Sequence, residues 1–217
     1  DSMATPELSY ACGTADFPLL GQTIGDILNE VAEKYPENEA IVSPKQEIRL
    51  TYRQFREAVD QVARGLMALD INKGDRVGIW AMNYAEWIIV QFATAKIGAI
   101  MVNINPSYRT FELEYCLKQS EIKLLILQGR FKTSDYVGMF YETCPEAYES
   151  RPGRILSEKF PFLKTVVFMG DIPYNGMYQW DDLLKKAESI SQDELIEREK
   201  ALDFDDAINI QYTSGTT

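Results

Sequence analysis

The sequence predicts an α/β fold built on a mostly parallel β-sheet. Between residues 76 and 128, apolar strands alternate with helical segments in the order strand, helix, strand, helix, strand, which is typical of parallel strands joined by right-handed crossovers. The strand at 122–128 is continuously apolar from Leu124 to Leu127, as expected for a sheet covered on both faces. With 217 residues, of which 46% are hydrophobic and 25% charged, the chain is large enough for a globular core.

Residue types that favour the N-cap position predict where the first four helices begin. Thr23 precedes an apolar stripe of helical period, and Thr51 opens the capping box "TYRQ". Asn83, with Glu86 three residues later, and Thr110 are the expected caps of the two crossover helices. The helix after Asn83 is apolar nearly all round, so we expect it to lie between two layers. The predicted helices span about 24–35, 52–70, 84–97, 110–119, 134–143, 180–189 and 191–202.

The remaining segments are strands, turns and loops. "AIVS" and "EIRLTY" predict a hairpin around Pro44, and "CPEAYESRPGR" predicts a loop. Residues 1–20 are polar and irregular and predict an N-terminal arm on the surface. The predicted strands of the main sheet span 76–81, 99–104, 122–128, 164–170 and 206–212.

Charge excludes several kinds of partner. Asp and Glu outnumber Lys and Arg by 33 to 22, and the net charge of −11 argues against nucleic-acid binding and against an anionic membrane surface. The most apolar region, residues 80–104, carries Glu86 and Lys96, so it lacks a run of about 20 apolar residues that could span a bilayer. No signal or transit peptide is recognised at the start of the chain. We therefore expect a cytoplasmic protein, or one of the mitochondrial matrix if a transit peptide has been removed.

Composition and motifs exclude several catalytic classes. The chain has no histidine, which removes Ser-His-Asp and Cys-His nucleophiles and the HExxH zinc motif within it. Cys12, Cys116 and Cys144 form no CxxC pair and predict buried thiols in a reducing compartment. GxGxxG, GxxxxGK[ST] and GxSxG are all absent. Four acidic residues are interpreted as helix-dipole partners and not as acid–base catalysts: Asp181, Asp182, Asp193 and Glu194.

The final residues, Thr213, Ser214, Gly215, Thr216 and Thr217, have the chemistry of a phosphate-binding loop. Gly215 lets the backbone approach a phosphate closely, and the four hydroxyls add side-chain donors to the backbone N–H groups. The segment also follows a predicted strand, and ligands of open α/β sheets gather at the carboxyl ends of strands. Taken alone, five small polar residues at a chain end are more often a disordered tail than a phosphate site.

The chain resembles the adenylate-forming enzymes, which include acyl-CoA synthetases, luciferases and peptide-synthetase adenylation domains. "YTSGTT" is similar to the start of that family's phosphate loop, which continues Gly-x-Pro-Lys-Gly; this continuation is not in the sequence. Residues 50–117, from "LTYRQF" through "KGDRVGIW" to the Asn105–Pro106 turn and "ELEYCL", resemble the family's N-terminal region along their length. "PLLGQTIGDIL", "FKTSDY" and "INIQYTSGTT" are most similar to medium-chain fatty acyl-CoA synthetases. The likeness covers about residue 7 to the end.

The resemblance implies a layered αβαβα fold and an enzyme that joins a fatty acid, ATP and coenzyme A, with Mg²⁺, through an acyl-adenylate. It assigns Thr213, Ser214, Gly215, Thr216 and Thr217 to the β- and γ-phosphates of ATP. It assigns no catalytic residue and no metal ligand within this chain. Residues 1–217 are therefore expected to be an incomplete N-terminal adenylation domain, inactive alone, lacking its C-terminal remainder and self-associating through exposed apolar surface, so that a homo-oligomer is an option.

Two alternatives stay open. One is a piece of another adenylating enzyme, such as an aryl-CoA ligase or a peptide-synthetase domain. The other is a non-enzymatic, flavodoxin-like interaction module that shares the strand–helix pattern.

Overall fold

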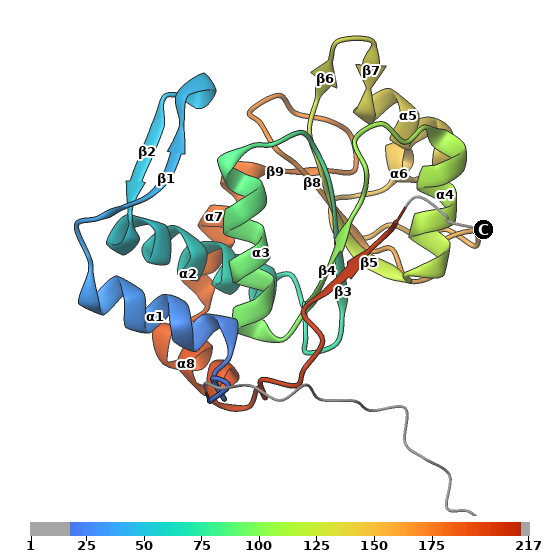
Figure 1. The fold of residues 1–217 in the computed structure, drawn as a ribbon. Helices are drawn as coiled ribbons and strands as arrows, with labels where there is room; N and C mark the ends of the chain where they lie inside the picture. Colours follow the sequence, from blue (N-terminus) through green and yellow to red (C-terminus); the bar gives the residue numbers. More distant parts are fainter. Residues whose placement is uncertain (1–17, 214–217) are drawn as a thin grey trace, which may run out of the picture.

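A computed structural model of the protein describes residues 18–213 and confirms the parallel sheet. Its six strands run in the order β10-β4-β3-β5-β8-β9, and all neighbouring pairs are parallel (Figure 1). The strands of this sheet are β3 (Arg76–Trp80), β4 (Ile100–Asn103), β5 (Ile122–Leu127), β8 (Thr165–Phe168), β9 (Tyr178–Gln179) and β10 (Asn209–Gln211). The helices are α1 (Ile24–Lys34), α2 (Tyr52–Ala68), α3 (Ala85–Ile97), α4 (Thr110–Gln119), α5 (Tyr136–Thr143), α6 (Glu146–Glu149), α7 (Trp180–Lys186) and α8 (Gln192–Lys200).

The sheet separates two hydrophobic clusters, because successive side chains of a strand point to opposite faces. In β5, Leu124 and Ile126 belong to one cluster, and Leu125 and Leu127 belong to the other; all four are fully buried. The first cluster takes its helical residues from α1, α2, α3, α7 and α8, and the second from α4, α5 and α6. A continuously apolar strand is thus explained by burial on both faces, as the sequence predicts.

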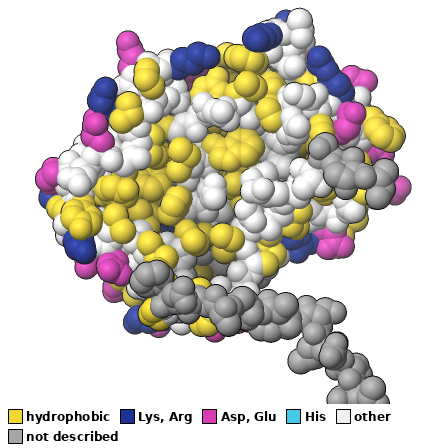
Figure 2. All heavy atoms as spheres, in the orientation of Figure 1, with side chains coloured by type: hydrophobic (Ala, Val, Ile, Leu, Met, Phe, Trp, Pro, Cys, Tyr) yellow, Lys and Arg dark blue, Asp and Glu magenta, His cyan; other side chains and the backbone are white. Residues whose placement is uncertain are grey.

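The described residues build a helix–sheet–helix sandwich, which is three of the five layers in the predicted αβαβα arrangement (Figure 1). As expected, α3 lies inside this packing, between the sheet on one side and α1, α2 and α8 on the other. Figure 2 shows one face of the molecule, on which charged side chains lie mostly around the rim while the centre is apolar or uncharged.

The helix caps predicted at Thr23 and Thr51 are confirmed. The Thr23 side chain accepts a hydrogen bond from the backbone N–H of Asp26, and Thr51 and Gln54 form the predicted reciprocal capping box. The acidic residues at the starts of α7 and α8 also serve their helices: Asp182 and Glu194 accept the backbone N–H of Gln179 and Ser191, respectively.

Two predicted caps are wrong. The N-cap of α3 is Tyr84 and not Asn83, and no side chain of its own turn caps the helix. Instead Gln46 reaches across from the hairpin: its Oε1 accepts the N–H of Ala85 at 2.8 Å, and its Nε2 donates to Glu86 at 2.8 Å. The cap of α4 is one residue earlier than expected, at Arg109, because the Glu112 carboxylate accepts the N–H of Arg109 at 3.0 Å.

Short elements account for the other differences. The hairpin around Pro44 is confirmed as antiparallel β1 (Glu39–Ser43) and β2 (Ile48–Thr51), joined by the 3-10 turn η1 (Pro44–Gln46). The two-residue strands β6 (Arg130–Phe131), β7 (Ser134–Asp135) and β9 were not predicted from the sequence, and α6 lies where the sequence predicts a loop. A second 3-10 turn, η2 (Ala187–Ser189), ends the predicted helix at 180–189. Of the predicted N-terminal arm, residues 18–20 form neither helix nor strand, and residues 1–17 lie outside the described part.

Candidate functional site

The candidate phosphate loop begins at the carboxyl end of edge strand β10. Gln211 is the last residue of that strand, and Thr213 follows two positions later with an exposed side chain. Ser214, Gly215, Thr216 and Thr217 lie outside the described residues, so the structure places only the first of the five predicted site residues. That residue stands at the edge of the sheet where ligands of open parallel sheets bind.

Tyr212 fixes the direction in which the chain leaves β10. Its ring packs against the second hydrophobic cluster and meets the ring of Tyr115 on α4 edge-on, with centroids 6.3 Å apart. Its hydroxyl lies 3.2 Å from Ser120 Oγ, and burial raises the pKa of the phenol, so the side chain stays neutral. The residue before the loop is thus an anchor on α4, a role that the sequence analysis did not assign.

A side-chain amide with an unpaired oxygen lies next to the end of β10, the strand that leads into the candidate loop. Asn103 ends β4 and pairs in register with Gln211 of β10. Its side chain is half-buried, and its buried Oδ1 atom has no hydrogen-bond partner. Since a buried polar atom without a partner is costly, Asn103 has hydrogen-bonding capacity left over for a group at this edge.

A second unpaired amide lies at the point where the chain changes direction across the sheet. From β3 the chain moves to β4 on one side, and after β4 it returns to β5 on the other side of β3. Gln128 follows β5 there and is 3% exposed; its Oε1 accepts the N–H of Met82, after β3, at 2.7 Å, while its Nε2 is unpaired. Such switch points are the usual ligand crevices of open α/β sheets.

Of the three buried side-chain atoms without a partner within residues 18–213, two are thus at the carboxyl ends of the sheet. The third is Arg64 Nε, on α2. Sequence reasoning missed Asn103 and Gln128, although each is an amide that ends an otherwise apolar strand.

The described thiols are not nucleophiles. Cys116 and Cys144 are fully buried, and burial raises the pKa of each thiol to about 11. A thiol with such a pKa is protonated at neutral pH and reacts slowly. The prediction of buried thiols is confirmed for these two, whereas Cys12 lies outside the described residues. Within residues 18–213, no three Cys, Asp or Glu side chains converge as a metal site would require.

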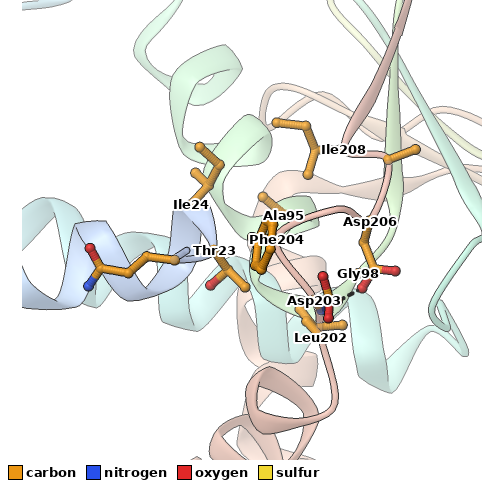
Figure 3. Close-up of a pocket in the computed structure, with 11 residues that line it drawn as sticks. Thr23, Ile24, Ala95, Gly98, Leu202, Asp203, Phe204, Asp206 and Ile208 are labelled. Atoms are coloured by element: carbon orange, nitrogen blue, oxygen red, sulfur yellow. Dashed lines mark hydrogen bonds between the residues drawn. The ribbon is translucent and has the colours of Figure 1, made fainter. Parts of the chain in front are cut away.

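The cavity shown in Figure 3 lies apart from the candidate phosphate loop. It has a volume of about 140 Å³ and lies between the start of α1, Gly98 at the end of α3, and Phe204. Ile208, which lines it, comes just before β10, so the cavity is at the amino ends of the strands, away from Thr213. No helix in the described part of the chain is long and apolar enough to cross a membrane.

Similarity to known proteins shows which family this chain belongs to. Residues 28–217 match the family described as AMP-binding enzyme, which is most of the chain and includes the candidate loop. The chain belongs to the AMP-binding enzyme family. Its membership agrees with the resemblance to adenylate-forming enzymes and decides against a non-enzymatic, flavodoxin-like module.

Relatives of this AMP-binding chain are acyl-CoA synthetases. It is 46% identical over 199 residues to YngI of Bacillus subtilis (strain 168), named as an acyl-CoA synthetase, with 92% of this chain and 36% of YngI covered. It is 38% identical over 211 residues to the human mitochondrial medium-chain acyl-CoA ligase ACSF2, covering 97% of this chain and 34% of ACSF2. The chain thus spans about a third of the length of the curated relatives it matches.

Solved structures of the family share the fold. The N-terminal domain of FACL13 from Mycobacterium tuberculosis superposes with a TM-score of 0.66 at 25% identity, covering 89% of this chain and 42% of that domain. A long-chain-fatty-acid-CoA ligase from Archaeoglobus fulgidus superposes with a TM-score of 0.68 at 22% identity, covering 97% of this chain and 38% of the ligase. The AMP-binding chain therefore has the architecture of the N-terminal part of acyl-CoA ligases.

Proposed function

We propose that this chain is the phosphate-binding N-terminal part of an ATP-dependent acyl-CoA synthetase that acts on medium-chain fatty acids. Membership of the AMP-binding family supports adenylation, and the similarity to ACSF2, named as a medium-chain acyl-CoA ligase, supports the substrate class. The observation that carries the proposal is the hydroxyl-rich segment that starts at Thr213, at the carboxyl edge of a parallel sheet.

The proposed reaction has two steps. A carboxylate oxygen of the fatty acid attacks the α-phosphorus of ATP, the bond to the β-phosphate breaks, and pyrophosphate leaves. The sulfur of coenzyme A then attacks the acyl carbon, and AMP leaves as the acyl thioester forms. A carboxylate is a poor electrophile, so the first step supplies a leaving group, and the charge that develops on the phosphates needs preorganised donors.

We assign those donors to residues 213–217, which would bind the β- and γ-phosphates through backbone N–H groups and hydroxyls. Asn103, next to the end of β10, offers one more polar group at the same edge. Mg²⁺ and coenzyme A belong to the proposal through the family alone. No described cluster of carboxylates fits a divalent cation, so we assign no residue to either.

A titration of the chain with nucleotides tests the loop assignment. ATP and pyrophosphate are expected to shift the NMR amide resonances of residues 213–217, whereas AMP, without β- and γ-phosphates, leaves them in place. Replacing Thr213 and Thr216 by valine should weaken the effect of ATP, and the same change at Thr133, an exposed threonine between β6 and β7, should not. Equal shifts with ATP and AMP, or none with ATP, would contradict the assignment.

The acid and the compartment are further parts of the proposal. An aryl acid is the alternative substrate, and a panel of medium-chain and aromatic acids offered to the longer protein separates the two. The proposed compartment is the cytoplasm, with the mitochondrial matrix as the alternative. Among the relatives, ACSF2 is named as mitochondrial, and YngI comes from a bacterium.

A further inference from the structure

A groove of about 570 Å³ lies at the amino-terminal edge of the sheet, opposite the edge that carries Thr213. Its floor is the start of β5 and β8, and its walls are the end of α2, the loop 152–156, and Tyr178 with the end of α7. Small-molecule sites are usually concave and between about 300 and 1,000 Å³. The groove is therefore large enough for a metabolite, and it belongs to no part of the proposed adenylation site.

Cationic side chains outnumber acidic ones in the lining of this groove. Lys123, Arg154, Lys164 and Lys186 line it, and Asp70 is its single acidic lining residue. The whole chain has a net charge of −11, so a concentration of positive charge in one concavity is opposite to the general balance. Like charges brought together repel one another, and a bound anion would relieve that repulsion.

Two of the cations are neighbours on adjacent strands. The backbone N–H of Lys164 donates to the backbone carbonyl of Lys123 at 2.9 Å. Since the next residues, Leu124 and Thr165, are paired in the parallel register of β5 and β8, the two lysines lie side by side. Like charges in this relation destabilise a sheet. Lys123 is neutralised by Asp70 and Asp75, at 3.2 and 2.8 Å.

The ammonium group of Lys164 has only a neutral partner. It donates to the carbonyl oxygen of Pro161 at 2.7 Å. Among the ion pairs formed by residues 18–213, none includes Arg154, Lys164 or Lys186. Three cations of the groove therefore have no carboxylate partner in the described part of the chain.

Helix C-termini explain the placement of two of the four cations, Lys123 and Lys186. The C-termini of α2 and α7 lie at the groove, and cations are favourable near helix C-termini. Lys123 donates to the carbonyl of Asp70, just past α2, and Lys186 is in the last turn of α7. Among the described residues, the Lys164 ammonium donates to Pro161, and no side-chain hydrogen bond joins Arg154 or Lys164 to a C-terminal carbonyl of α2 or α7, so contact with these helix ends does not explain their placement.

The walls hold these cations in place. Lys186 Nζ lies 4.6 Å from the centre of the Tyr178 ring, a cation–π contact that keeps the ammonium at the groove. The loop that carries Arg154 packs closely on the same tyrosine: Gly153 has φ of 77°, and a Cβ there would lie 3.1 Å from Tyr178 Oη. The N–H of Ile155 donates to the Lys164 carbonyl at 3.1 Å and ties the loop to β8.

We propose that this groove binds the phosphate group of a small phosphate ester, with Arg154, Lys164 and Lys186 as its cationic contacts. Arginine can bind phosphate oxygens in a bidentate manner, and lysine supplies compact positive charge. The space beyond the three cations accommodates the organic part of the ester. The proposal does not depend on the proposed function, because it uses none of the residues at the carboxyl edge.

An NMR titration with inorganic phosphate and with glycerol phosphate, at constant ionic strength, tests the proposal. Saturable shifts are expected at the amides of Gly153 and Thr165, with the ester binding more tightly than inorganic phosphate. Equal affinity for the two would overturn the assignment of an ester and leave free phosphate as the ligand. Shifts that chloride reproduces, or the absence of saturable shifts, would overturn the site.

Matched variants locate the contacts. Lys164→Gln and Lys186→Gln are each expected to weaken glycerol phosphate binding about tenfold, which is the effect of losing about 1.4 kcal/mol. Lys185→Gln, at the exposed neighbour of Lys186 that does not line the groove, is the control and should leave the affinity unchanged. Thermal unfolding of each variant reports whether it remains folded. Equal weakening by all three folded variants would show a diffuse charge effect and overturn the site.

Discussion

At the scale of single residues, Lys96 has the largest effect that we expect on stability. Its side chain is 1% exposed, and its Nζ lies 2.5 Å from Asp60 Oδ1, 2.8 Å from Asn29 Oδ1 and 3.2 Å from Glu199 Oε1. These contacts join α3 to α1, α2 and α8. Burial raises the pKa of Glu199 despite the nearby ammonium.

Replacing Lys96 by methionine should lower the free energy of unfolding by about 3–5 kcal/mol, because two largely buried carboxylates, those of Asp60 and Glu199, lose their countercharge. Urea denaturation measures this loss. The control is Lys118→Met, which breaks the exposed pair with Glu114 and should cost less than about 1 kcal/mol. Similar costs for the two variants would contradict the account of the cluster.

The described thiols give a second prediction at this scale. With the pKa of Cys116 and Cys144 raised to about 11, both are protonated in the folded chain at about pH 8. In a Cys12→Ser variant, a thiol-reactive dye should label neither one quickly under native conditions and both after denaturation. Because the unfolded thiols ionise at lower pH than the folded ones, stability from these groups is present below about pH 9 and falls as the pH rises toward 11. Rapid labelling of the native chain would contradict this.

At the scale of elements, the start of α3 depends on the hairpin. Gln46 caps the helix from 39 residues away and also contacts Ser43 and Glu86. Gln46→Ala should therefore cost about 1 kcal/mol, typical of a lost N-cap. Asn83→Ala, at the exposed residue that the sequence suggests as the cap, should cost only a few tenths. The order of the two denaturation midpoints decides between the caps, and a larger loss for Asn83→Ala would contradict the structure.

Elements were predictable where their signals are local. The caps at Thr23 and Thr51 lie beside their helices, and the apolar runs of β3, β4 and β5 give the parallel sheet directly. The cap of α3 was not predictable, because Gln46 reaches it only through the fold of the hairpin. Strands of two residues, such as β9, carry no periodicity at all.

The same limit applies to the candidate site. The hydroxyls and the glycine of residues 213–217 are visible in the sequence, and so is the strand that precedes them. The unpaired amides of Asn103 and Gln128 are not, because the absence of a partner is a property of packing. The groove around Lys164 is also invisible in the sequence, since its cations come from four separate segments.

At the scale of the whole molecule, one face has a composition suited to contact with other protein. Charged groups lie around its rim and apolar groups nearer its centre (Figure 2). The exposed apolar side chains of the described residues include Val42 and Ile88, which line a depression between the hairpin and α3. Depletion of charge from the centre of a patch is typical of interfaces. We expect the isolated chain to self-associate as its concentration rises. Light scattering that shows a strict monomer throughout would contradict this expectation.

The most direct test of the central claim is pyrophosphate exchange with octanoate and ATP. The chain spans about a third of its curated relatives, and the proposed activity is that of a protein with the remaining two thirds. We predict octanoate-dependent exchange by the chain extended with that remainder, and none by the isolated 217 residues. Exchange by the isolated chain, or its absence in the folded, extended protein, would contradict the account.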